Sequence, residues 1–139
     1  MTIVAMHPGL YDPASQQPEL HGTACATCRS VFFPPITLGC EKCGATPDQL
    51  QATSIAAKGT LHSIATVHMH AGKDIEAPFT VAEVQLDDGP LIRAVMSGAA
   101  TVADIGRHVR AEWVSVGAAG EPEEKIEPRF TIVAKGDNA

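Results

Sequence analysis

The chain has 139 residues, of which 45% are hydrophobic and 19% charged, and its formal net charge is -6. This composition predicts a soluble folded protein of one domain, or a compact domain with a small appendage. The acidic balance argues against a nucleic-acid-binding surface, which usually shows as a basic face. The N-terminus lacks the features of a secretory signal peptide, and no apolar run approaches the ~18 residues that span a bilayer. We therefore expect a cytoplasmic protein with reduced thiols and no membrane contact.

The first segment, residues 1–20, contains three prolines and two glutamines and shows little periodicity. It predicts a loosely packed N-terminal arm. Strand patterns begin only after Leu50. We therefore divide the chain into an arm at 1–20, a cysteine-bearing lobe at 21–50 and a β domain at 51–139.

All four cysteines lie in two Cys-x-x-Cys pairs separated by eleven residues: Cys25, Cys28, Cys40 and Cys43. Two such turns facing each other supply four thiolates at the corners of a tetrahedron, the ligand set of structural zinc. A thioredoxin-type redox pair needs a strand–helix context, and Pro34 and Pro35 leave no room for a useful helix between the pairs. The pattern predicts one zinc per chain, with iron second and disulfides last among the alternatives.

The predicted lobe is a zinc ribbon in which the metal has a structural role. Gly44 follows the second pair, where a knuckle turn favours positive φ, and Arg29 holds the matching position in the first pair. A closed four-cysteine site leaves no open coordination position for catalysis. A lobe of roughly 25 residues buries too little apolar surface to be stable alone, so metal ligation is expected to supply the missing folding energy.

Between the pairs lies an unusual apolar segment, which contains Phe32, Phe33, Pro34 and Pro35. Adjacent residues of a strand point to opposite faces, so both phenylalanines cannot pack under one small lobe. The second ring either packs on the neighbouring domain of the same chain or belongs to an exposed patch that docks a partner. The sequence leaves both interpretations open.

The C-terminal part reads as five strands, which we expect at residues 59–70, 79–86, 91–96, 108–116 and 129–134. A short helical turn is expected at 101–106 and a long charged loop at 117–128. Five strands with a short helix between the third and fourth are typical of a partly open OB-fold barrel. The predicted fold is thus mainly β, with a rubredoxin-like four-cysteine zinc ribbon followed by a five-stranded OB-fold barrel.

Side-chain patterns place the core of this barrel and argue against a nucleic-acid groove. In the second strand alternate residues form one apolar face: Thr80, Ala82, Val84 and Leu86. Trp113 is expected to fill the barrel or cap one end. Grooves for single strands need basic tracks and stacking aromatics, whereas Phe79, Trp113 and Phe130 all sit at expected core positions.

In this order, the parts resemble the zinc-ribbon/OB-fold acyl-CoA-associated family. The resemblance rests on "FFPP" between the knuckles, on "VAEVQLDDGPLIRAVM" and "IGRHV" in the barrel, and covers about residues 20 to 135. It implies a small subunit that binds a thiolase, a thiolase-like lipid-transfer protein or an aldolase. It also implies complexes that form or cleave carbon–carbon bonds of acyl-CoA substrates. Arg29 departs from the usual knuckle glycine, and the N-terminal arm is short.

No catalytic constellation can be recognised, because every cysteine is assigned to the metal. His68 and His70 share a strand face and are the only candidate general bases; the competing interpretation is that they face solvent. Coenzyme A carries phosphates, and the cations near the ribbon and the early strands are Arg29, Lys42, Lys58 and Arg93. The sequence does not choose among these cations, so the CoA-binding residues stay unknown.

Together these observations predict an accessory subunit without turnover of its own. Its partner would be a thiolase-like or aldolase protein, which the patch at residues 32–35 would bind. Contact with the CoA ester is left open. The alternatives are a single-stranded nucleic-acid-binding OB module and a pure protein scaffold.

Overall fold

The computed structural model describes residues 2–72, 75–117 and 120–134. These residues form strands joined by loops and two short 3-10 turns, η1 (Pro47–Gln49) and η2 (Val102–Asp104). None of the helical segments described is long and apolar enough to cross a membrane. The strands are β1 (Thr2–Ala5), β2 (Glu19–Cys25), β3 (Val31–Phe32), β4 (Leu50–Ala56), β5 (Lys58–Val67), β6 (Phe79–Leu86), β7 (Leu91–Val95), β8 (His108–Val116) and β9 (Glu123–Ile132).

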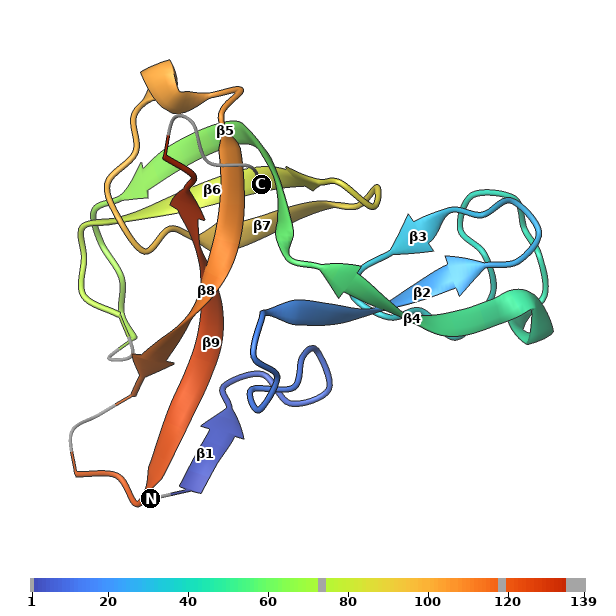
Figure 1. Cartoon of the computed structure of the whole chain (residues 1–139), viewed down its shortest axis with the longest axis horizontal. Coiled ribbons are helices and arrows are strands. Elements are labelled where there is room, and N and C mark those ends of the chain that lie inside the picture. Colours follow the sequence, from blue (N-terminus) through green and yellow to red (C-terminus); the bar gives the residue numbers. More distant parts are fainter. Residues whose placement is uncertain (1, 73–74, 118–119, 135–139) are drawn as a thin grey trace.

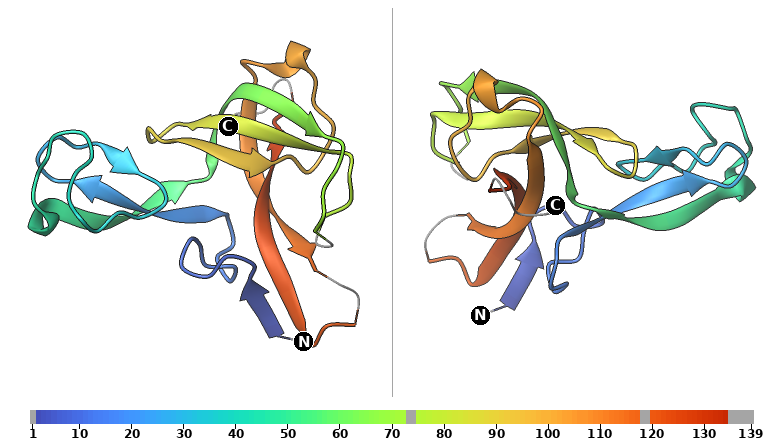
Figure 2. Two further views of the ribbon diagram at one scale, coloured as in Figure 1. Left: turned by 180° about the vertical axis from the view of Figure 1, so that it is seen from behind. Right: turned by 45° about the horizontal axis from the view of Figure 1, so that its top comes forward.

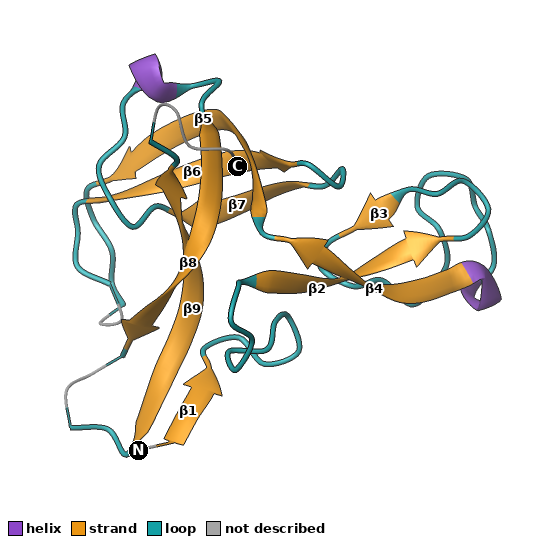
Figure 3. Cartoon of the chain, viewed as in Figure 1, coloured by secondary structure: helices purple, strands orange, loops and turns teal. Residues whose placement is uncertain are grey.

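Two sheets build two lobes, which Figure 1 shows side by side. The smaller sheet has the order β3-β2-β4 and forms the ribbon lobe. The larger sheet has the order β1-β9-β8-β5-β6-β7 and curls into the barrel (Figure 3). The two further views in Figure 2 show that the ribbon lobe projects from one side of the barrel. β4 leads directly into β5, so the chain passes from one lobe to the other within a few residues.

The larger sheet has the strand pairing of an OB-fold. β5 pairs with both β6 and β8, β6 pairs with β7, and β8 pairs with β9. Closure comes from a parallel bridge between Met96, just after β7, and Phe130 in β9, where the Ser97 N–H donates to the Phe130 carbonyl at 2.8 Å. The predicted five-stranded barrel is confirmed, with β1 added as a parallel strand beside β9.

β5 pairs with two neighbours, β8 at its start and β6 along most of its length. The register between β5 and β6 shifts between Leu61 and Ser63, which is the local irregularity that a bulge introduces. Gly59 lies at the crowded start of this strand, where an added Cβ would come within 2.0 Å of the Gln85 carbonyl oxygen. Only glycine fits a backbone approach this close.

The core follows the predicted alternation. Ala82, Val84 and Leu86 are buried, whereas Gln85 between them is exposed. They join a cluster that includes Leu61 and Phe130 from other barrel strands. The cluster also takes in Leu20 and Ile55 from the ribbon sheet, so the two lobes share one hydrophobic core.

The N-terminal segment is packed, which corrects the expectation of a loose arm. β1 pairs with β9 from Thr2 to Ala5. Tyr11 is buried, and its hydroxyl donates to the Ile126 carbonyl at 2.7 Å and accepts the His7 N–H at 3.1 Å. Trp113 packs beside it, with ring centroids 5.4 Å apart, and donates its indole N–H to the Ser15 carbonyl. Proline-rich composition concealed these long-range contacts.

Two predicted boundaries also differ from the structure. The loop expected at 117–128 is too long, because β9 begins at Glu123 and pairs with β8 as far as the Val116–Lys125 pair. Charged residues occupy this strand because its outward positions alternate with the buried Ile126. In addition, β4 pairs with β2 along its whole length, so the ribbon sheet extends to Ala56.

The Tyr11 hydroxyl can be tested by Tyr11→Phe, which we expect to lower the free energy of unfolding by about 1 kcal/mol. The cost stays modest because Ile126 keeps a second donor, the Met6 N–H at 2.9 Å. Urea unfolding would measure the change. The control Thr66→Val removes an exposed hydroxyl and should change stability by less than about 0.5 kcal/mol. Equal stability of wild type and Tyr11→Phe would contradict the packed N-terminal segment.

Candidate metal centre and docking face

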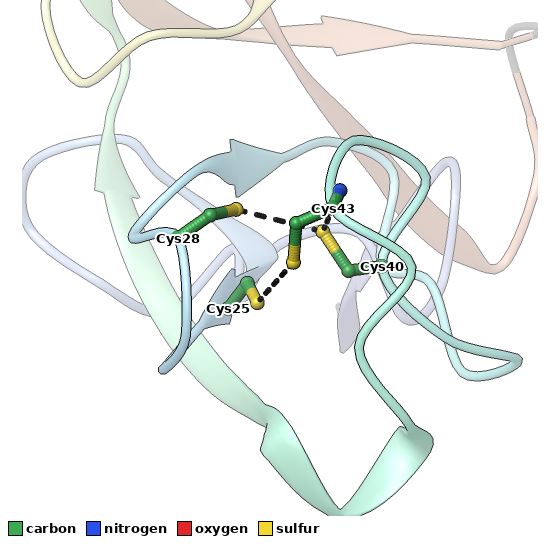
Figure 4. A group of neighbouring side chains, drawn as sticks. All are labelled: Cys25, Cys28, Cys40 and Cys43. Atoms are coloured by element: carbon green, nitrogen blue, oxygen red, sulfur yellow. Dashed lines mark hydrogen bonds between the residues drawn. The ribbon is translucent and has the colours of Figure 1, made fainter.

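The four cysteines converge at the far end of the ribbon lobe. Their sulfur atoms all lie within 4.8 Å of one another. Figure 4 shows them directed toward a common centre, with Cys25 and Cys43 sulfurs 3.7 Å apart and Cys28 and Cys40 sulfurs 3.6 Å apart. A tetrahedron of thiolates around zinc, with Zn–S bonds of about 2.3 Å, has edges of about 3.8 Å. The donor set therefore fits one zinc ion.

Two equivalent backbone turns hold the sulfurs in place. The Arg29 N–H donates to the Cys25 carbonyl at 2.8 Å, and the Gly44 N–H donates to the Cys40 carbonyl at 3.0 Å. Arg29 and Gly44 have φ angles of 64° and 77°, in the left-handed region. The predicted correspondence of these two positions is confirmed, and Arg29 adopts a conformation that is costly for a non-glycine residue.

The electrostatics of the centre favour a cation. The Ser30 hydroxyl and backbone N–H lower the pKa of the Cys28 thiol to about 6. The Ala45 N–H lowers the pKa of the Cys43 thiol. Burial and the other three sulfurs outweigh this effect and raise the pKa of Cys43 to about 12. Four sulfurs this close do not all ionise without a metal to balance their charge. When zinc is bound, the four thiolates fill its tetrahedron, which is the arrangement of a structural site.

The residues that follow the first cysteine pair contact both lobes. Phe32 lies in β3 beside Thr23 and is half-buried. Phe33 packs against the shared core and, with Tyr11 and Phe130 among others, lines a small cavity of about 240 Å³ between the lobes. Packing on the neighbouring domain is thus the interpretation that fits Phe33. Pro34 and Pro35 are exposed, so they remain available to a partner.

The two candidate general bases lie in the barrel domain, outside the ribbon lobe. His68 and His70 follow the end of β5 and are exposed, and His70 packs edge-to-face on Phe79 with ring centroids 5.3 Å apart. The candidate CoA-binding cations do not form one group. Arg29 and Lys42 lie in the knuckles, Lys58 begins β5, and Arg93 lies in β7, where it pairs with Glu83 at 3.5 Å.

Two apolar features of the ribbon were not found from the sequence. Leu38, in the loop before the second knuckle, is 94% exposed. A groove of about 720 Å³ crosses the outer face of the ribbon sheet, lined by the loop at 35–37, by Pro47 and by β2 and β4. Leu38 stands in a run of apolar and proline residues whose burial only the fold decides, so the sequence carried no signal for either feature.

Fold and site together define a class of protein, a four-thiolate zinc ribbon joined to an OB-fold barrel. Residues 14–48 match the family model described as the ChsH2 rubredoxin-like zinc ribbon domain. Residues 52–114 match the model described as the ChsH2 C-terminal OB-fold domain. The chain therefore belongs to the ChsH2 family of zinc-ribbon and OB-fold proteins.

A solved structure agrees with this assignment. A chain of the structure described as "Ltp2-ChsH2(DUF35) aldolase" is 26% identical to this chain and superposes with a TM-score of 0.61. The similarity covers 81% of this chain and 83% of that chain. A search among curated proteins found no match.

The zinc assignment predicts one zinc per chain in protein purified without added metal, and its loss in Cys40→Ser. Elemental analysis would measure both. Because protons compete with the metal for thiolates, lowering the pH should release zinc and unfold the ribbon lobe. Chelator-washed protein that contains neither zinc nor iron yet keeps its fold would contradict the assignment.

The knuckle geometry predicts a separate effect of Gly44→Ala. Nothing lies within 4 Å of the added methyl group, so the strain of positive φ acts alone. That strain costs about 1 kcal/mol and should weaken zinc binding about fivefold in a competition titration with a chelator. Gly98→Ala also adds a methyl group in open space, but without positive φ, and should bind zinc as wild type does. Equal affinities for the two variants would refute this account.

Proposed function

We propose that this chain is an accessory subunit that binds a thiolase-like or aldolase protein acting on acyl-CoA substrates. The observation that carries the proposal is the match of both lobes, in order, to ChsH2 domains, together with the similarity to a chain of an Ltp2-ChsH2(DUF35) aldolase. That structure is described as an aldolase that combines a ChsH2-type chain with a second protein, Ltp2. The simplest role for the present chain is that of the corresponding subunit in an equivalent assembly.

The chemistry of the site supports an accessory role. All four cysteines gather at the metal centre, which leaves none of them free as a nucleophile. His68 and His70 are exposed just after the end of β5. The catalytic groups of the complex would then come from the partner.

The ribbon lobe is the part best suited to hold this partner. Pro34, Pro35 and Leu38 are exposed, and the zinc ion would fix the loop that presents them. Rigid apolar side chains lose little conformational entropy on binding, which suits them as anchors. Phe32 is half-buried in β3 and would add to this surface, whereas Phe33 would support it from the side of the barrel.

The test uses the purified chain and a thiolase-like or aldolase protein from the same organism. We expect a stable hetero-oligomer by size-exclusion chromatography with light scattering, and carbon–carbon bond cleavage or formation on an acyl-CoA only by the complex. Turnover by this chain alone would refute the accessory role. Loss of activity in His68→Ala or His70→Ala with assembly intact would instead assign a catalytic base to this chain.

A further inference from the structure

In the part of the chain that the structure describes, the ribbon sheet ends in a strand whose outer side pairs with no other strand. β4 is the terminal strand of the order β3-β2-β4, and among the described strands it pairs with β2 alone. In Figure 3 the first part of β4, next to η1, lies at the lower border of the ribbon lobe, and the strand then crosses β2 toward the barrel. An edge of this kind presents backbone donors and acceptors in a row, ready to pair with another chain.

The hydrogen bonds of β2 show which groups of β4 face outward. The Ala26 N–H donates to the Gln49 carbonyl at 2.8 Å, and the Ala57 N–H donates to the Pro18 carbonyl at 3.3 Å. In an antiparallel ladder every second pair exchanges such bonds. With the observed register, residues 51, 53 and 55 therefore bond to β2, and the residues between them point away.

The two ends of this outward row are already satisfied. The Leu50 N–H donates to the Pro47 carbonyl. The Ala56 N–H donates to Asp88 Oδ2 at 3.3 Å. Within the described residues, the N–H and C=O groups of Ala52 and Ser54 remain without a backbone partner.

The edge also lacks the usual protection against pairing. Natural edge strands are blunted by lysine, proline, a bulge or a covering segment. β4 reads LQATSIA, with no charged residue and no proline, and its register with β2 is unbroken over seven residues. An unprotected edge on a folded protein is explained if an assembly partner covers it.

A groove beside the edge offers room for side chains. Leu50, Ala52 and Ser54 alternate along β4, share one face and line the groove of about 720 Å³ with the loop at 35–37. Because Ala52 and Ser54 are small, every second side chain of an added strand could enter the groove on this face. The other walls include Pro35, Ile36 and Pro47, which favour an apolar side chain.

Charge selects among possible occupants of the edge. Asp48 lies just before the Leu50 end, whereas Glu19 pairs with Ala56 and Asp88 bonds to it at the other end. A second copy paired antiparallel through β4 would bring Asp48 of one chain toward Glu19 and Asp88 of the other. Lys58 follows at the Ala56 end, but Glu19 and Asp88 outnumber it there, so the acidic ends repel and the better occupant carries cations at both ends.

We propose that β4 accepts an extended segment of the thiolase-like partner as a fourth strand of the ribbon sheet. The segment has uncharged residues in its centre, alternate apolar side chains toward the groove, and Lys or Arg at its ends. This proposal rests on the proposed function, because it identifies how that partner is held.

The test compares two substitutions at one position. Ala52→Pro removes an outward N–H, which leaves the bonds between β4 and β2 intact. Ala52→Ser keeps the N–H at nearly the same size. We expect Ala52→Pro to weaken binding of the same thiolase-like protein at least tenfold by calorimetry, and Ala52→Ser to bind as wild type does. Zinc content and thermal unfolding would verify that each variant is folded.

Amide hydrogen exchange on the wild-type complex gives a second measurement that needs no variant. Binding should slow exchange at Ala52 and Ser54, and this result decides the matter if Ala52→Pro fails to fold. Wild-type affinity in folded Ala52→Pro, or unchanged exchange at both amides in a complex that forms, would overturn the strand addition and leave the proposed function standing. If wild type does not bind the thiolase-like protein, both proposals fall. A homodimer that Ala52→Pro dissociates would overturn the proposal in favour of a second copy.

Discussion

Four sulfur atoms around one metal ion support the part of this protein that reaches beyond the barrel. The ribbon lobe buries few side chains of its own, chiefly Thr23, Cys25 and Cys40, while Leu20 and Ile55 belong to the core shared with the barrel. Without the metal, the four neighbouring thiols would have no common partner. The loop that carries Pro35 and Leu38 would then no longer be held at Cys40, where it ends. Because ligation is coupled to folding, zinc binding also stabilises the ribbon sheet, in which Cys25 ends β2.

The barrel supplies the hydrophobic core that the small ribbon lobe lacks. Leu20, Ile55 and Phe33 extend from the ribbon into the barrel core, and Tyr11 closes the same region from the N-terminal segment. These contacts orient the ribbon sheet relative to the barrel, because one continuous core does not permit independent motion of its halves. The outer face and edge of the ribbon sheet are thus presented at a fixed place, which is a condition for specific docking.

Under the proposed function, metal, groove and edge form one arrangement in which this chain contributes a binding surface and the partner contributes the reacting groups. The zinc ion holds the knuckles, the knuckles hold the loop at 35–37, and that loop forms a wall of the groove beside β4. An OB-fold barrel commonly suggests binding of single-stranded nucleic acid. Here two of the barrel aromatics belong to the packing: Phe130 is buried, and Trp113 packs against Tyr11.

The sequence alone determined the features that depend on local spacing and alternation. Cysteine spacing specified the metal ligands, and the period-two pattern around Ala82 and Val84 specified a barrel strand and its buried face. Only the tertiary structure decided that the N-terminal segment packs through Tyr11 and that β9 begins at Glu123. It also decided that, within the described residues, the outward N–H and C=O groups of Ala52 and Ser54 have no backbone partner. The physical reason is that pairing between strands depends on partners distant in the chain, which no local pattern of residue types records.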